Sequence, residues 1–98
     1  MSEPLTFKQA NKKYLKTLEQ YVPVVARVHG EHHPEFHDVR AVFDEIKVKA
    51  ASPVIPDLSS EFARLRKITN NYEVPGDVCE SYEAVYSMLA ELDKAYRG

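Results

Sequence analysis

Residues 78–96, VCESYEAVYSMLAELDKAY, carry the clearest helical pattern in this sequence. Apolar side chains recur there at steps of 4, 3, 4, 3 and 4 residues, from Val78 to Tyr96. That spacing places them along one side of an α-helix, with polar and charged residues on the other side. Such a helix buries its apolar stripe against a neighbouring element. The stretch therefore predicts a long helix, beginning near residues 75–77, at the side of a packed core.

A second long helix is predicted over residues 7–29. Thr6 and Gln9 form a capping-box pattern at its start, and Gly30 is a natural C-cap at its end. Pro23 lies inside the segment, where it lacks a backbone donor and crowds the preceding turn. We therefore expect this helix to be kinked or divided at the proline.

Two shorter helices are predicted between these segments. One begins at Pro34, a residue favoured at the first helical position, and ends before a connector at residues 51–56. The other is capped by Asp57 or Ser59 and ends at Asn70–Asn71. The residues expected to face inward in the first three helices are Phe7, Tyr14, Leu18, Tyr21, Val25 and Val28; Phe36, Val39, Phe43, Ile46 and Ala50; and Leu58, Phe62, Leu65, Ile68 and Tyr72.

The fold class predicted from these segments is all-α. No stretch alternates between apolar and polar residues over a convincing length, so strands are not expected. Four amphipathic helices joined by short links are typical of an antiparallel four-helix bundle. We expect residues 1–98 to form one such domain.

Composition excludes several classes of function. The 98 residues carry a net charge of −2, whereas a general nucleic-acid binder is normally basic. No apolar run approaches the length that spans a bilayer, so a membrane protein is not expected. The single cysteine allows no internal disulfide and suggests a reducing compartment. A cytoplasmic location without nucleic-acid or membrane partners is therefore the expectation.

All four histidines fall within residues 29–37. A metal site is one interpretation of His29, His32, His33 and His37, because neutral imidazoles bind iron and zinc well. A polar junction between two helices is the other, since Pro34 interrupts the four-residue spacing. The chain has no Glu-x-x-His or His-x-x-x-Glu pair, and no histidine outside this segment, which argues against a complete di-iron centre within one chain.

Cys79 and a lysine stripe are the other candidate functional groups. Cys79 is expected in the first turn of the last helix, where a thiol can become reactive, although small packing cysteines are commoner there. Lys8, Lys12 and Lys16 recur every four residues, and a solvated helix face is favoured over a docking site for an acidic partner.

Two stretches resemble a known family. Residues 25–36, VARVHGEHHPEF, resemble the V-x-x-V-H-G-x-x-H-P-E-L segment of the hemerythrin-like repair-of-iron-centres (RIC) proteins. Residues 65–82, LRKITNNYEVPGDVCESY, with Tyr86 and residues 89–92, resemble that family's L-R-x-L-T-N-x-Y-x-x-P-x-D-A-C-x-x-Y-x-x-L-Y-x-x-L-x-E-L segment. The resemblance covers roughly half of the chain, which also resembles a short variety of the family.

The resemblance implies a hemerythrin-like bundle with shortened helices. Full-length relatives hold a di-iron centre and help to restore damaged iron–sulfur clusters, so iron and iron–sulfur protein partners are implied. Of the family's iron ligands, only His29 is matched cleanly. The resemblance implies a ligand histidine before the Tyr14-Leu15 pair, but residues 11–13 there are Asn, Lys and Lys, and residues 55–63 contain no histidine. We therefore expect a non-enzymatic, stress-associated or protein-binding role without a complete di-iron centre in one chain.

Three alternatives remain open at this point. Two or more chains could pool His29, His32, His33 and His37 with nearby carboxylates into a shared iron or zinc site. The chain could be a structural or interaction module that forms a homo-oligomer through leftover apolar surface. Catalysis through Cys79 is the last alternative.

Overall fold

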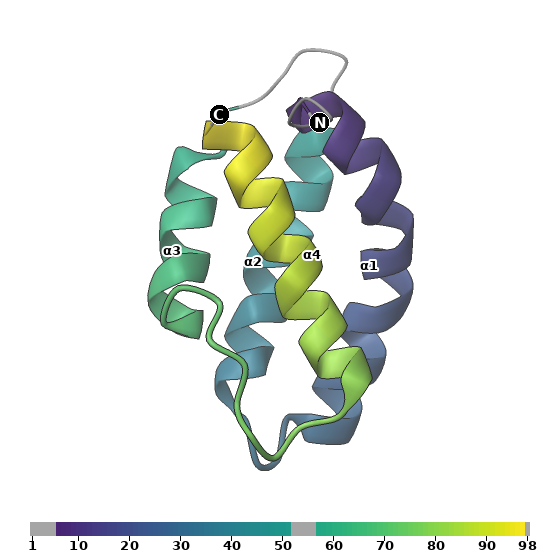
Figure 1. The fold of residues 1–98 in the computed structure, drawn as a ribbon, viewed down its shortest axis with the longest axis vertical. Coiled ribbons are helices and arrows are strands. Elements are labelled where there is room, and N and C mark those ends of the chain that lie inside the picture. The colour runs from purple at the N-terminus through teal and green to yellow at the C-terminus, as the bar shows by residue number, and fades with distance from the viewer. Residues whose placement is uncertain (1–5, 52–56, 98) are drawn as a thin grey trace, which may run out of the picture.

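The computed structural model describes residues 6–51 and 57–97 of the chain (Figure 1). Within these two ranges the regular structure is entirely helical, as the apolar spacing predicts. The helices are α1 (Phe7–His29), α2 (Glu35–Ala50), α3 (Ser59–Thr69) and α4 (Glu80–Arg97).

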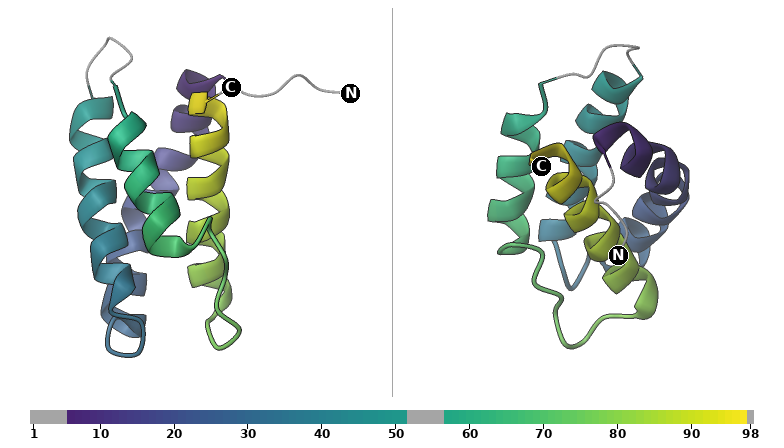
Figure 2. Two further views of the ribbon diagram at one scale, coloured as in Figure 1. Left: turned by 90° about the vertical axis from the view of Figure 1, so that its left-hand side faces the viewer. Right: turned by 45° about the horizontal axis from the view of Figure 1, so that its top comes forward.

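The helices run alternately up and down, and they pack side by side (Figure 1). α1 lies against both α2 and α4, and α2 lies against α3. α3 has only 11 residues and ends partway along the bundle, so an extended loop completes the path to the start of α4 (Figure 2). The turn between α1 and α2 and the end of the α3–α4 loop therefore lie at the same end of the molecule.

The core is built from the apolar stripes of all four helices. Aliphatic and aromatic side chains from each helix are almost fully buried, and this packing supplies most of the stability of short helices. The buried apolar residues are Phe7, Ala10, Leu18, Val22, Val25, Ala26, Phe36, Val39, Val42, Phe43, Ile46, Leu58, Phe62, Leu65, Tyr82, Val85, Tyr86, Leu89 and Leu92.

The predicted ends of α1 are confirmed. The Thr6 hydroxyl accepts a hydrogen bond from the Gln9 backbone, and the Gln9 side chain accepts one from the Thr6 backbone. These reciprocal bonds satisfy two donors that the first helical turn leaves without partners. At the other end, Gly30 is the C-cap, and its N–H donates to the Ala26 carbonyl.

Pro23 was expected to kink or divide α1, and the structure contradicts the division, because the helix is continuous from Phe7 to His29. The missing N–H would have bonded the carbonyl of Glu19, so the helix continues through the proline with one backbone hydrogen bond fewer. Tyr21 and Val28 were expected to face inward but are exposed, because the buried stripe passes through Val22 instead.

The starts of the later helices also differ from the prediction. Pro34 is the N-cap of α2 rather than its first residue. α4 begins at Glu80, later than predicted, because residues 73–79 are drawn into the loop. α3 begins at Ser59, and its N-cap is Leu58, which makes no side-chain capping hydrogen bond, so the prediction that Asp57 or Ser59 caps this helix is wrong. The Asp57 carboxylate lies one residue before the cap and accepts a hydrogen bond from the Ser59 backbone N–H. Of the predicted connector, residues 52–56 lie outside the described residues.

A buried carboxylate joins α3, the following loop and α4. Asp93 is 0% exposed, and its oxygens accept hydrogen bonds from Arg66 at 2.7 and 2.8 Å, from the Tyr72 hydroxyl at 2.7 Å and from Arg97 at 3.1 Å. We call these four residues the Asp93 corner. Both carboxylate oxygens are satisfied, so the buried charge is compensated.

The outer surface agrees with two expectations. Lys8, Lys12 and Lys16 are all exposed, as a solvated face requires. No helix in the described parts of the chain is long and apolar enough to cross a membrane.

Candidate functional site

The end of the bundle where the α1–α2 turn meets the α3–α4 loop brings together several groups capable of chemistry. We call His29, His33, Glu35, Asp77 and Cys79 the histidine corner. The first three come from the end of α1, the turn and the start of α2, and the other two come from the loop before α4. Residues more than 40 positions apart in the sequence are thus neighbours in space.

His29 and Cys79 form a hydrogen-bonded pair. The Nε2 atom of His29 lies 3.0 Å from the Sγ atom of Cys79. His29 is half-buried at the last position of α1, while Cys79 is exposed immediately before α4. His29 ends α1 and Cys79 directly precedes α4, and the packing of α1 against α4 brings the two positions together.

His33 lies between two carboxylates. Its Nδ1 atom is 2.8 Å from Oε1 of Glu35, and its Nε2 atom is 3.0 Å from Oδ1 of Asp77. Hydrogen bonding to Glu35 is the largest cause that raises the pKa of His33 above its ordinary value, with Asp77 adding to the effect and desolvation partly opposing it. A protonated His33 donates to both carboxylates and so ties the α3–α4 loop to the start of α2.

The Tyr82 ring packs against the rings of both His29 and His33. The ring centroids of His29 and His33 each lie 5.5 Å from that of Tyr82 and meet it edge-on. The Tyr82 hydroxyl is 3.0 Å from the Tyr86 hydroxyl, and both tyrosines are buried. Burial raises the pKa of both phenols, so they stay neutral and act as hydrogen-bonding packing groups.

The other two histidines lie outside these contacts. His32 is exposed in the turn, and His37 is exposed on α2. The His37 ring lies over Gly30, because a Cβ atom added to that glycine would be 2.3 Å from His37 Nε2. The four histidines thus share one end of the bundle without sharing one centre.

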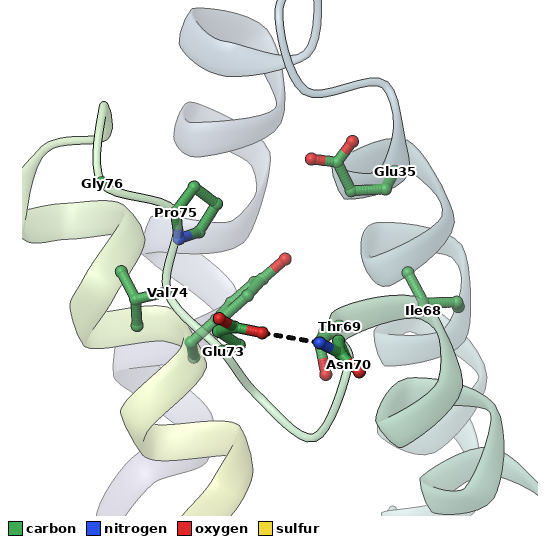
Figure 3. Close-up of a pocket in the computed structure, with 9 residues that line it drawn as sticks. Glu35, Ile68, Thr69, Asn70, Glu73, Val74, Pro75 and Gly76 are labelled. Atoms are coloured by element: carbon green, nitrogen blue, oxygen red, sulfur yellow. Dashed lines mark hydrogen bonds between the residues drawn. The ribbon is translucent and has the colours of Figure 1, made fainter.

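An open pocket of about 340 Å³ adjoins the histidine corner (Figure 3). It lies between the end of α3, the loop at residues 73–76 and the start of α2. Glu35 and Glu73 both line it, and Glu73 accepts a hydrogen bond from Asn70 at 2.6 Å. Its charged lining is therefore acidic.

The described residues do not fit the di-iron centre that the family resemblance implies. Among them, no group of three or more His, Cys, Asp or Glu side chains is arranged to hold a metal ion. The buried Glu61 carboxylate instead contacts the Lys49 ammonium, at 2.5 Å from its Oε2 atom. A metal site at His29, His32, His33 and His37 stays a prediction, one that needs ligands from a second chain.

Two oxygens in the interior have no hydrogen-bond partner within the described structure. They are Oδ1 of Asn11 and Oε1 of Glu61. Asn11 comes from α1 and Glu61 from α3. Each helix thus places one polar oxygen inside the bundle without a partner among the described residues.

The sequence identified single groups in this site but not their partners. His29 and Cys79 were each considered, yet their pairing was missed because 50 residues separate them. Glu35 had a local signal, since it lies two residues after His33. Sequence periodicity gave no signal for the contacts of Asp77, of Asp93 or of the Lys49–Glu61 pair.

Comparison with known proteins adds no family assignment. No model of a known protein family matches the chain, and no solved structure matches it. Over residues 6–51 and 57–97, the geometry defines an all-α arrangement of four packed helices with a polar corner at one end.

Proposed function

We propose that this chain is a small hemerythrin-like bundle related to the RIC proteins, with a stress-associated role in binding iron–sulfur proteins and without a complete di-iron centre of its own. The role is non-enzymatic, and the bundle serves as a scaffold. The Lys49–Glu61 ion pair is the observation that carries the proposal.

That pair supports the proposal through charge. A di-iron cage needs several anionic or imidazole ligands directed at one point from different helices. Here the buried Glu61 has an ammonium group as its cationic partner, and hydrogen bonding to Glu61 raises the pKa of Lys49, which keeps it charged. A protein cation from α2 thus compensates the charge of Glu61 without a metal ion.

The motif that carries the resemblance supports the proposal through structure. Asn70, Asn71 and Tyr72 all have positive φ values, between 53° and 64°, so this turn reverses the chain without glycine. The turn brings the Tyr72 hydroxyl to Asp93, to which Arg66 also donates. The motif therefore has a scaffold role in this chain that is independent of metal binding.

Metal analysis of the untagged full-length chain tests the proposal. The protein is purified without oxygen from iron-replete cells, and iron and zinc are measured by mass spectrometry. We expect far less than one iron per chain, and the same thermal midpoint with and without a strong chelator. A second measurement titrates the chain into an iron–sulfur enzyme damaged by nitric oxide, with the intact enzyme as the control. Binding that is tighter to the damaged enzyme is expected.

Other outcomes of these measurements would contradict the proposal or support an alternative to it. Two irons per chain, lost together with stability on chelation, would overturn the proposal. Absence of binding to both forms of the enzyme would remove the partner that it names. Chains that associate only when iron or zinc is added would instead support the shared metal site.

A further inference from the structure

α1 forms one side of the bundle (Figure 1), and it carries an apolar stripe in addition to the one that enters the core. The members of this stripe recur at steps of 3, 4, 3 and 4 residues: Tyr14, Thr17, Tyr21, Val24 and Val28. Tyr21, Val24 and Val28 are 38%, 45% and 59% exposed, and they are three of the five large hydrophobic side chains that are exposed in the described structure. Exposed apolar residues that are gathered on one face, rather than scattered, are typical of an interaction surface.

The residues next to this stripe decide what lies on each side of it. The residues that directly follow three of its members are buried in the core: Leu18, Val22 and Val25. Lys13, Lys16 and Arg27 each directly precede a member of the stripe, and all three are exposed. Successive residues are about 100° apart around a helix, so these cations form a row on the solvent side of the stripe. We call the stripe and this row together the α1 outer face.

The α1 outer face has the opposite charge to the chain as a whole. α1 contains five lysine and arginine residues but one acidic residue, Glu19, whereas the chain has a net charge of −2. The Lys13 ammonium lies 5.1 Å from the centroid of the Tyr14 ring, which places a cation directly beside the stripe. A positive row along an apolar stripe attracts an acidic partner.

Two other kinds of occupant fit this face less well. Two copies of the chain that met through it would bring together two α1 helices of the same positive charge, which is unfavourable. A membrane surface is contacted by helices that bury a whole apolar face, whereas α1 directs its main apolar face into the core. Steps of 3 and 4 residues are the spacing at which one helix packs along another.

We propose that the α1 outer face is a docking site for an acidic amphipathic helix of a partner protein. The apolar side chains of the partner helix pack on Tyr21, Val24 and Val28, and its carboxylates face the basic row. The inference is independent of the proposed function, because it requires neither iron nor an iron–sulfur protein.

The test uses two synthetic helical peptides, each long enough to cover residues 14–28. Both have leucine at steps of 3 and 4 residues, and the remaining positions are mainly glutamate in one peptide and lysine in the other. Binding to the full chain is measured by isothermal titration calorimetry. We expect the acidic peptide to bind roughly tenfold more tightly than the basic one, and its affinity to fall as salt is added.

Variants locate the binding surface. Val24→Asp and Arg27→Glu should each weaken binding of the acidic peptide by roughly tenfold. Val48→Asp and Arg40→Glu make the same changes at exposed positions of α2, and they should alter the affinity by less than about twofold. Circular dichroism shows that each variant keeps the helical content of wild type before its affinity is compared.

Four outcomes would overturn the inference. The first is equal affinity for the acidic and basic peptides, or binding of neither. The second is an affinity for the acidic peptide that the α1 and α2 variants lower equally. Self-association in analytical ultracentrifugation that Val24→Asp abolishes would assign the face to a second copy instead. Binding to phosphatidylglycerol vesicles that Val24→Asp abolishes would assign it to an anionic membrane.

Discussion

The Asp93 corner and the histidine corner both join the α3–α4 loop to a neighbouring helix, but they do so in different ways. In the Asp93 corner, one fully buried carboxylate receives hydrogen bonds from three other side chains. In the histidine corner, the groups are half-buried or exposed and form two separate contacts: His29 with Cys79, and His33 with two carboxylates. Asp77, for example, is 70% exposed, whereas Asp93 is 0% exposed.

The difference in burial gives the two corners different roles: the Asp93 corner stabilises the fold, and the histidine corner exposes reactive groups. A buried charge cannot lose its partners without a large penalty, so the Asp93 corner must be held together as a unit. Exposed pairs contribute little to stability but remain accessible to reagents and partners. The loop is thus fixed at its start and chemically accessible at its end.

The largest expected effect comes from removing the centre of the Asp93 corner. Asp93→Ala leaves Arg66 without its buried partner, and the free energy of unfolding should fall by about 4 kcal/mol. Urea denaturation followed by circular dichroism measures the loss. Glu91→Ala, at an exposed position of the same helix, is the control and should change stability little. A loss below about 1 kcal/mol for Asp93→Ala would mean that the corner is not a stabilising unit.

The next effect tests the packing of the histidine corner with a matched pair of glycines. A Cβ atom at Gly30 would lie 2.3 Å from the Ala26 carbonyl oxygen, whereas one at Gly76 meets nothing within 4 Å. Gly30→Ala should therefore lower the free energy of unfolding by about 2 kcal/mol. Gly76→Ala should leave it within about 0.5 kcal/mol of wild type. Thermal and urea denaturation measure both changes. If Gly30→Ala and Gly76→Ala lower stability equally, the described packing of the turn is contradicted.

A single hydrogen bond of the Asp93 corner should have a smaller effect. Tyr72→Phe removes the hydroxyl that donates to Asp93 but keeps the ring, so stability should fall by about 1.5 kcal/mol. Tyr21→Phe, on the exposed side of α1, is the control. If both substitutions lower the free energy of unfolding equally in urea denaturation, the hydrogen bond from Tyr72 to Asp93 does not stabilise the fold.

The smallest effect is the pH dependence contributed by His33. Its pKa is raised in the folded state, so its stabilising contribution is fully present below its ordinary pKa of 6.5 and is lost as pH rises through the raised value. The effect should stay under about 1 kcal/mol because the carboxylates are partly exposed. The free energy of unfolding, measured at a series of pH values across this range, should depend less on pH in His33→Gln than in His32→Gln. An unchanged slope in His33→Gln would assign the titration to another group.

Local pattern was a good guide to the helices and a poor guide to the site. The stripe in residues 78–96 and the Thr6–Gln9 cap gave correct elements, because spacing and capping depend on neighbours in sequence. The start of α4 was placed too early because Asp77 is held by His33, 44 residues away. The burial of Asp93 could not be predicted from the sequence, because acidic residues are normally exposed unless they are paired, and its partners were not known.

The sequence by itself determined which segments are helical, where α1 is capped, and that all histidines lie near one turn. Those properties follow from the periodicity of side chains along a single helix and from residues only a few positions apart. Tertiary structure alone decided that Cys79 meets His29 and that Asp93 meets Arg66. The physical reason is that helix packing sets which distant faces come together, and periodicity contains no information about that choice.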